Sequence, residues 1–304
     1  MTKALFKTYK FVPSGVYPFD LEIIPIPKLK GKSASNSEKR RLLMTPHRTE
    51  FHSIIVITEG SYTHMVDFEN IHCKAGTWLF IKSGQIQSFD MDSDFDGYMI
   101  IFRPEFLSLK INSLRQNVSE CLFVLLPDSM VLKNEHEIGL INIKQMQKDL
   151  ESYSSLEKCN EILRIHLELL LTRIYLTLES SDANKTMLPP KVQMQFWKFK
   201  KNIENRINVK YQVQSFADEL GCSEKTLNRV VQQAVGKTAK EYIKGHLVLE
   251  VKRSLMHTDL TISEIAYKFG FDETTNFSKF FKRETGATPK NFRDRYMNQL
   301  LTTA

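Results

Sequence analysis

The predicted helix over residues 223–235 has two faces of opposite character. Leu227, Val230 and Val231 recur at helical spacing and form an apolar stripe. The opposite, polar face consists of Glu224, Lys225, Asn228, Arg229 and Gln232. An arginine can donate paired hydrogen bonds to guanine O6 and N7, and an asparagine can pair with adenine N6 and N7. These residue types favour contact with base edges in DNA; the alternative is a polar face that is simply solvated.

A second predicted helix, over residues 273–285, repeats this design with different side chains. Phe277, Phe280 and Phe281 form its apolar stripe. Its outward residues are Glu273, Thr274, Thr275, Ser278 and Lys279. A threonine offers one methyl contact and one hydrogen bond, so this face has fewer groups that can make paired contacts with a base. We expect it to contribute more to anchoring on phosphates, helped by Lys282 and Arg283 further along the helix.

Both helices belong to a segment that is duplicated. Residues 215–221 are echoed by residues 263–270, and the matching alanines and glycines lie 49 positions apart. The corresponding pairs are Ala217 and Ala266, Gly221 and Gly270, and then, after one inserted residue, Leu227 and Phe277, Val231 and Phe281, Gly236 and Gly286, Thr238 and Thr288, and Tyr242 and Phe292. Each copy is a short amphipathic helix, a glycine turn and a second amphipathic helix. This order is typical of a helix-turn-helix motif, which places its second helix in the major groove of DNA.

Further helices are predicted around the two copies. They cover residues 196–208, 213–220, 238–257, 262–269 and 288–298, with Ser223 and Thr288 as N-caps. The helix over 238–257 connects the copies, and about nineteen residues at a rise of about 1.5 Å span roughly 28 Å. Successive major-groove faces on one side of B-DNA lie roughly 34 Å apart. A rigid helix of this length can therefore hold two recognition helices in adjacent groove segments.

The positive charge of the chain is concentrated in the duplicated part. Residues 191–304 contain 20 Lys+Arg and 12 Asp+Glu, a net charge of +8. Residues 1–190 contain 22 Lys+Arg and 23 Asp+Glu, a net charge of −1. A phosphate-binding module requires such a basic surface, and its coincidence with the duplication strengthens the DNA-binding interpretation.

Several protein classes are disfavoured by simple features of the sequence. Cys73, Cys121, Cys159 and Cys222 are widely spaced and form no C-x-x-C pair, which argues against a zinc finger and a disulfide framework. The first residues lack the apolar core of a signal peptide, and no uncharged apolar stretch is long enough to span a membrane. No nucleophile elbow, P-loop or Rossmann glycine pattern is present. We therefore expect a cytoplasmic protein that is not an enzyme and does not associate with membranes.

The first half of the chain favours antiparallel strands followed by helices. Short β-branched and aromatic runs at 54–57, 77–81 and 98–102 are separated by turn residues, at a spacing typical of a barrel or sandwich. Residues 31–41 are polar and are interpreted as a loop. From about Asn134 the apolar residues recur at helical spacing, and a polar stretch with Pro189 and Pro190 follows as a linker.

The predicted helix over residues 162–178 is unusually apolar, so it must be buried on more than one side. One interpretation is that it only packs on the barrel. The other adds a second subunit, which would make the protein a homodimer. Leu167 and Leu171 are the positions we would replace with charged residues to separate these interpretations.

The C-terminal part resembles the AraC/XylS family of bacterial transcriptional regulators. The resemblance is carried by the sequences ISEIAYKFGF at 262–271, NFSKFFK at 276–282, GATP at 286–289 and Phe292-Arg293, and it extends over about 196–296. Residues 51–84 resemble, more loosely, the cupin-like sensory domains of such regulators. The resemblance implies an α+β two-domain protein. Its parts are a cupin-like antiparallel β-barrel with C-terminal helices over 1–180, a linker over 181–192, and an all-α domain over 193–304 with two helix-turn-helix motifs joined by a long helix.

The resemblance also implies functional residues and partners. It places base contacts at Lys225, Asn228 and Arg229. The full set of predicted DNA-binding residues is Ser223, Lys225, Asn228, Arg229, Gln232, Thr274, Thr275, Lys279 and Arg283. The implied partners are promoter DNA, RNA polymerase and a small organic effector, and the implied effect on transcription is activation.

The histidines of the first half raise the question of a metal site. His47, His52 and His64, with Glu50, resemble the ligands by which cupin enzymes hold iron or manganese. The second half of such a site calls for a histidine shortly after the turn at Gly84, where this chain has Gln87. We therefore expect no metal or other cofactor, and a barrel used for sensing. The predicted effector-binding residues are Arg48, His52, Trp78, Gln87 and Phe89.

Two other functions remain as alternatives. One is a cupin metalloenzyme fused to a DNA-binding tail, which bound metal would reveal. The other is an architectural DNA-binding protein without a ligand, which a strong preference for one promoter sequence would exclude.

Overall fold

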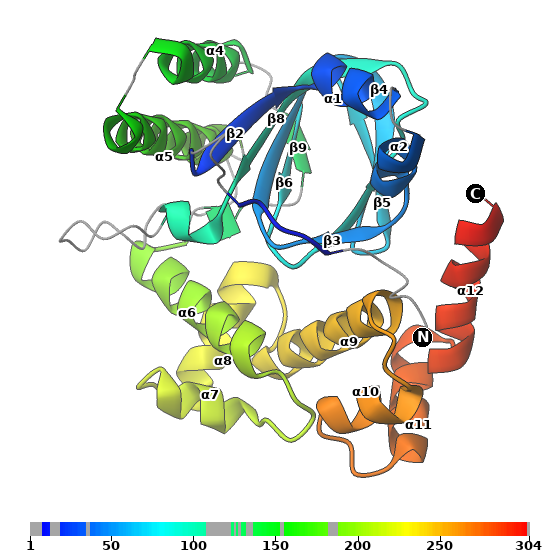
Figure 1. Cartoon of the computed structure of the whole chain (residues 1–304). Helices are drawn as coiled ribbons and strands as arrows, with labels where there is room; N and C mark the ends of the chain where they lie inside the picture. The colour runs from blue at the N-terminus through cyan, green and yellow to red at the C-terminus, as the bar shows by residue number, and fades with distance from the viewer. Residues whose placement is uncertain are drawn as a thin grey trace. The chain divides into compact units, whose positions relative to one another are not determined.

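The computed structural model divides the chain into two units, drawn in Figure 1. The residues that the structure describes are 8–12, 19–34, 37–107, 123–124, 126, 129–131, 136–152, 155–181 and 188–302. One unit covers Thr8–Met187 and contains all of the described strands, and the other covers Leu188–Ala304 and is helical. The architecture is thus the expected combination of a β-barrel domain with C-terminal helices and an all-α domain.

The barrel is organised around one long strand. The strands are β1 (Thr8–Tyr9), β2 (Leu21–Pro25), β3 (His47–Thr49), β4 (His52–Val66), β5 (Glu69–Lys74), β6 (Thr77–Ile81), β7 (Ile86–Phe89), β8 (Phe95–Phe102) and β9 (Ser129–Val131). The predicted strands at 54–57, 77–81 and 98–102 are confirmed as parts of β4, β6 and β8. The first half of β4 pairs with β6 and β8 and its second half with β5 and β7, all antiparallel. Only the β1–β3 pair is parallel among the described strands.

A bend in β4 lets this strand serve both halves of the barrel. The register with β8 shifts between Ile57 and Glu59, and Gly60 follows with a φ of 69°. A Cβ atom at Gly60 would lie 2.1 Å from the carbonyl oxygen of Asp94. Because only glycine tolerates both this backbone conformation and this close approach, Gly60 is needed for the bend.

The barrel unit has two hydrophobic cores, because successive side chains of a strand point to opposite faces of the sheet. On one face, Ile54, Val56, Trp78 and Phe80 belong to a cluster that continues into the helices α4 (His136–Ser152) and α5 (Leu156–Ser181). On the inner face, Ile55, Ile57, Leu79 and Ile81 belong to a second cluster inside the barrel. Side chains of a strand point alternately to opposite faces, so a sheet that is covered on both faces needs continuous apolar runs, as β4 and β6 have.

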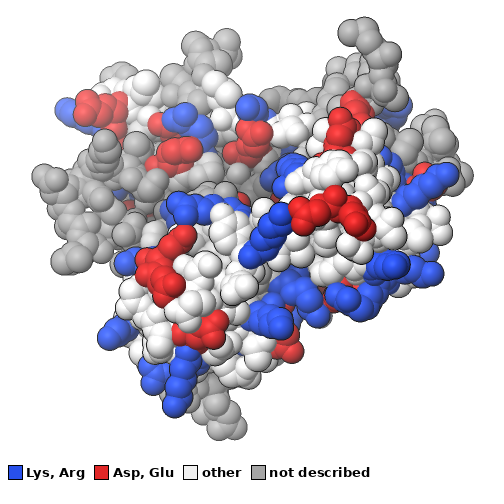
Figure 2. Space-filling model, turned by 90° about the horizontal axis from the view of Figure 1, so that it is seen from below, with Lys and Arg blue, Asp and Glu red and all other residues white. Residues whose placement is uncertain are grey.

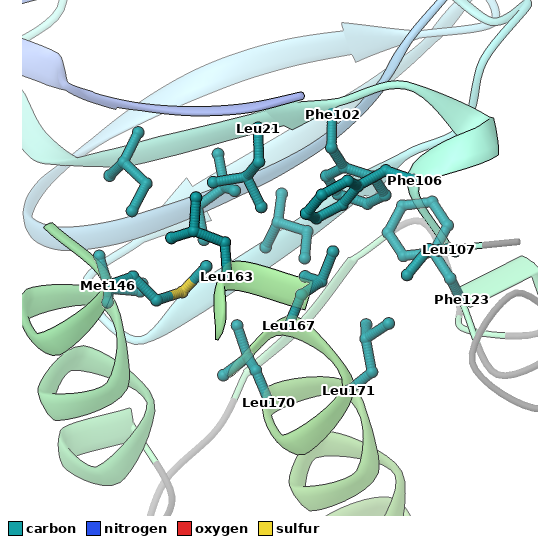
Figure 3. Packing of buried hydrophobic residues seen from close by; sticks show 14 of the residues in the cluster. Leu21, Phe102, Phe106, Leu107, Phe123, Met146, Leu163, Leu167, Leu170 and Leu171 are labelled. Carbon is teal, nitrogen blue, oxygen red and sulfur yellow. The ribbon is translucent and has the colours of Figure 1, made fainter. Parts of the chain in front are cut away.

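The buried side of α5 faces the sheet (Figure 3). Leu163, Leu167, Leu170, Leu171 and Ile174 are at most 1 % exposed and pack with the strand residues of the first cluster. The choice of Leu167 and Leu171 as positions for testing a subunit contact was therefore wrong, because both lie in the core of one chain. An apolar helix residue cannot be assigned to an intramolecular or intermolecular contact from periodicity alone.

The loop predicted at 31–41 is also wrong. The structure has two short helices there, α1 (Ile26–Ala34) and α2 (Ser37–Met44). Ile26 and Leu29 of α1 pack into the inner cluster of the barrel. Lys, Arg and Leu have good helix propensities, and contact with the barrel supplies the apolar burial that the polar composition of this segment conceals.

The helical unit contains the two predicted motifs. Its helices are α6 (Pro190–Arg206), α7 (Val213–Glu219), α8 (Glu224–Val235), α9 (Ala239–His257), α10 (Ile262–Lys268), α11 (Thr274–Thr285) and α12 (Pro289–Thr302). Helix α6 begins earlier than predicted because Pro190 occupies its first turn, where a proline costs no hydrogen bond. The first motif is α7–α8, the second is α10–α11, and α9 joins them (Figure 1).

Candidate nucleic-acid interface and effector barrel

Helix α8 is fixed at both ends and along its buried side. The Ser223 hydroxyl accepts a hydrogen bond from the Thr226 amide at 3.2 Å, which confirms Ser223 as the N-cap. Gly236 ends the helix with a φ of 68°. Leu227, Val230 and Val231 are at most 1 % exposed, as the apolar stripe predicts. The polar face of α8 is therefore held in one orientation.

Three predicted contact residues on α8 are available to a ligand. Lys225, Arg229 and Gln232 are all exposed. Within the described part of the chain, no hydrogen bond or ion pair engages the side chains of Lys225 and Arg229. Two cations with unoccupied donors on one helix face suit an anionic, hydrogen-bonding partner such as DNA. Figure 2 shows Lys and Arg side chains as separate patches among acidic and uncharged residues.

Asn228 is placed differently from its neighbours on α8. Its side chain is half-buried, and its Oδ1 atom accepts a hydrogen bond from the backbone amide of Ala239 at 3.0 Å. Its Nδ2 atom donates to the carbonyl oxygen of Glu224 at 3.1 Å. Both ends of this amide are thus engaged within the chain. Nothing in the order of residues along α8 distinguishes Asn228 from Arg229 in this respect.

Helix α11 presents a similar face with fewer paired donors. Thr275, Lys279 and Arg283 are exposed, and Thr274 is half-buried with its hydroxyl 3.1 Å from that of Ser263. The Arg283 guanidinium contacts Glu284 at 2.9 Å and lies over the ring of Phe280. Phe277 and Phe281 are fully buried.

Helix α9 is constrained at both of its ends. At its start, Thr238 and Glu241 form a capping box, in which each residue's side chain accepts a hydrogen bond from the other's backbone amide. At its end, the Arg293 guanidinium of α12 donates to the carbonyl oxygens of Leu255 and Leu260, at 3.0 and 2.7 Å. This helix has the 19 residues predicted for the connection. Its length and its fixed ends suit a spacer between two recognition helices.

Inside the barrel, three polar side chains form a buried chain of hydrogen bonds. His64 Nε2 donates to Gln87 Oε1 at 3.1 Å, and His64 Nδ1 accepts from the Tyr62 hydroxyl at 3.1 Å. Burial, with a smaller contribution from the nearby His47, lowers the pKa of His64 to about 3, although the hydrogen bond with Gln87 acts in the opposite direction. Burial also raises the pKa of Tyr62 and raises that of the neighbouring Cys73 thiol to about 12. The group therefore offers neutral hydrogen-bonding atoms at physiological pH.

The five predicted effector residues do not share one face of the barrel. Gln87 and Phe89 lie on the inner side, where the rings of Phe89 and His64 are 4.6 Å apart. Trp78 lies on the opposite side and packs toward α4 and α5, and the His52 ring contacts Phe102 and Phe123 on that side. The guanidinium of Arg48 lies near Gly84. Strand alternation separates residues that are close in sequence.

The histidines predicted from the sequence as possible metal ligands have different hydrogen-bond partners in the structure. His64 is bonded to Tyr62 and Gln87, whereas His52 Nδ1 accepts a hydrogen bond from the Ser83 amide at 2.9 Å. In the residues covered by the structure, no three His, Cys, Asp or Glu side chains gather as a metal-binding group. Gln87 occupies the contact with His64 that a further ligand would require.

Two family models match the chain. Residues 37–138 match an AraC-like ligand binding domain, and residues 216–295 match a helix-turn-helix domain. The first match includes most of the barrel strands and the second covers α8 to α11 completely. The two matches therefore assign the two units separately.

Known relatives align with most of the chain. The HTH-type transcriptional activator RhaR of Shigella dysenteriae serotype 1 (strain Sd197) is 25% identical over 255 residues, which are 81% of this chain and 86% of that protein. RhaR of Escherichia coli O139:H28 (strain E24377A / ETEC) matches with the same identity and coverage. These relatives are transcriptional regulators and not enzymes.

Among solved structures, the unsaturated fatty acid-bound ToxT from Vibrio cholerae strain SCE256 aligns with a TM-score of 0.42 and 14% identity, covering 82% of this chain and 89% of that one. An AraC-type regulator from Chromobacterium violaceum aligns with a TM-score of 0.32 and 20% identity, covering 36% and 96%. In the described part of the chain, no helix is long and apolar enough to cross a membrane.

Proposed function

Because the chain belongs to the AraC family of transcriptional regulators, we propose that it binds promoter DNA sequence-specifically and activates transcription when a small organic effector occupies its barrel. The observation that carries the DNA-binding part is the pair of motifs α7–α8 and α10–α11, joined by the 19-residue helix α9. Activation is supported by the relatives, which are activators. RNA polymerase is then the expected protein partner, and the cytoplasm, where bacterial promoters lie, is the expected location.

We assign base contacts first to Lys225, Arg229 and Gln232, and phosphate contacts to Thr275, Lys279 and Arg283, with Ser223 and Thr274 at the helix starts. Arg229 is exposed, and among the described residues none bonds to its guanidinium, which supports this assignment. Replacing Arg229 by alanine should weaken binding of the preferred duplex by about 1–3 kcal/mol, roughly 5- to 150-fold, and binding of random DNA much less.

Fluorescence anisotropy with a duplex selected from a random-sequence pool by the wild-type chain provides the test. Arg229→Lys is the matched control, because lysine keeps the charge but loses the forked donor geometry. If Arg229→Lys binds the selected duplex as tightly as the wild type, Arg229 does not read a base. If the wild-type chain selects no sequence at all, specific DNA binding is refuted.

We propose that the effector binds on the inner side of the barrel, in contact with Gln87. The uncharged Gln87 amide, whose oxygen is held by His64, and the surrounding apolar inner cluster support an organic ligand held by a few polar contacts. A thermal-shift screen of metabolites should find a ligand that, at 100 times its dissociation constant, stabilises the protein by about 2.7 kcal/mol. Gln87→Leu should abolish that shift, whereas Trp78→Phe on the opposite face should retain it.

We also propose that the protein is a homodimer joined through α5, by a face other than the one first expected. Ile165, Leu169 and Leu176 are 54, 41 and 53 % exposed, and with Ile162 and the exposed Thr172 they alternate at spacings of three and four residues. Such a stripe matches the seam by which two copies of one helix pack. A dimer would also turn binding of a second half-site into an intramolecular event.

Sedimentation equilibrium tests this contact. Ile165→Lys with Leu169→Lys should halve the mass and weaken binding to a two-site duplex far more than to a one-site duplex. Val12→Lys, which changes an apolar side chain that is 68 % exposed elsewhere, is the control and should leave the mass unchanged. A monomeric wild type would eliminate the dimer.

A further inference from the structure

We infer that Asn228 acts as a positioning residue, which locks the recognition helix α8 to the start of α9, and that it is not a base reader. The inference rests on the proposed DNA-binding function of α8. It departs from the expectation that Asn228 contacts a base edge.

The geometry of the Asn228 amide supports this role. Its Oδ1 atom accepts the backbone N–H of Ala239 at 3.0 Å across eleven residues of sequence, and its Nδ2 atom is bonded to Glu224. Ala239 is fully buried and is the first residue of α9. The first N–H groups of a helix have no partner within that helix, and a buried one left unpaired is costly. Asn228 is the residue that supplies the partner.

Two other backbone amides at this helix start have partners of their own. The backbone amide of Thr238 donates to the Glu241 carboxylate at 2.8 Å, and the amide of Glu241 donates to the Thr238 hydroxyl at 3.2 Å. The capping box therefore does not serve Ala239. An acceptor from outside α9 is needed, and the outward face of α8 is the side from which it comes.

At the corresponding helix start of the second motif there is no backbone N–H that requires a partner. In the register of the duplication, Ala239 corresponds to Pro289 and Asn228 to Ser278. Pro289 is also buried and also begins a helix, α12, whose start is capped by the Thr288 hydroxyl accepting the Asn291 amide at 3.1 Å. A proline has no N–H to satisfy. The copy with an N–H has an asparagine opposite it, and the copy without one has a serine.

A direct consequence is that Asn228 controls the angle of α8 relative to the spacer helix. Loss of its hydrogen bond should loosen the recognition helix and weaken binding to every DNA sequence by a similar factor. A residue that reads a base would instead change the preference at one base pair.

A double-mutant cycle on the full chain tests the inference, with Asn228→Ala, Ala239→Pro and both together. Ala239→Pro copies the second motif, and Thr238 before it is already extended, with φ −70° and ψ 155°, as a residue before proline should be. The probes are the duplex selected from a random-sequence pool and its single-base variants. Asn228→Asp, which keeps the oxygen acceptor, is the matched control for stability.

When Ala239 is kept, Asn228→Ala should weaken binding of the selected duplex and of all its variants about tenfold. It should also lower the melting temperature of the helical unit by several degrees. In the Ala239→Pro background the same change should alter affinity less than about twofold, and Asn228→Asp should keep the wild-type melting temperature. An equal loss in both backgrounds, with a changed preference at one base pair, would overturn the inference. If the wild type selects no duplex, the proposed function fails, while the melting temperatures of the cycle still decide whether Asn228 acts through Ala239.

Discussion

Acid should destabilise the barrel unit through His64. This side chain is fully buried, and its pKa in the folded protein is lowered from 6.5 to about 3, chiefly by burial. Because the folded pKa lies below the unfolded one, the neutral ring's contribution to stability is complete above about pH 6.5 and is lost as the pH falls toward 3. Each pH unit in that window costs about 1.4 kcal/mol, so the loss between pH 7.5 and 5 is about 2 kcal/mol.

Urea denaturation as a function of pH measures this loss. The chain has two tryptophans, and Trp78 lies in the barrel unit whereas Trp197 lies in the helical unit. In a Trp197→Phe background, the fluorescence of Trp78 therefore reports unfolding of the barrel unit alone. The free energy of unfolding should fall by about 2 kcal/mol between pH 7.5 and 5 beyond the change contributed by all other groups.

His64→Gln supplies that comparison. Glutamine can still donate to Gln87 and accept from Tyr62 but does not titrate. The difference in unfolding free energy between the two proteins should therefore change with pH below 6.5 and stay constant above it. Parallel curves from pH 7.5 to 5 would refute the argument that His64 is held neutral by burial.

Two further predictions concern stability. Leu167→Ala, at a fully buried position of α5, should lower the free energy of unfolding by about 2–5 kcal/mol in the same urea assay. Leu169→Ala, on the exposed stripe, should lower it much less. A similar loss for both variants would contradict the assignment of the two faces. In the helical unit, Gly236→Ala should cost about 1 kcal/mol of stability, because φ is 68° but nothing lies near the new Cβ atom. Gly270→Ala should cost clearly more, because its Cβ atom would lie 2.2 Å from Asn208 Oδ1. Thermal unfolding followed by circular dichroism compares the two variants, and equal losses would show that the close approach is unimportant.

Some features could be predicted from the sequence because they depend on local patterns. The helices of both motifs follow from apolar residues at helical spacing, and Gly236 and Gly286, which correspond in the duplication, both end a helix in the left-handed conformation. The Ser223 cap and the strands of the barrel are likewise local. The charge difference between the two halves is a property of composition alone.

Only the tertiary structure decided which face of each strand or helix packs against its neighbours and which face is left exposed. Strand alternation places His52 and Trp78 on the side of α4 and α5, and Gln87 and Phe89 inside, but no pattern reveals this when both faces of a sheet are apolar. The same holds for α5, whose two apolar sides are equivalent in sequence, with Leu167 packed on the sheet and Leu169 exposed.

Asn228 shows most clearly how tertiary packing changes a role predicted from the sequence. Its residue type and its place on α8 predict a group that faces DNA, and the structure gives its amide oxygen to the N–H of Ala239. That hydrogen bond exists because α8 and α9 pack at one particular angle, which brings together two residues that helical periodicity treats separately. Periodicity determines which faces a helix has, whereas the packing of one helix on another determines which of its polar groups are left for a partner.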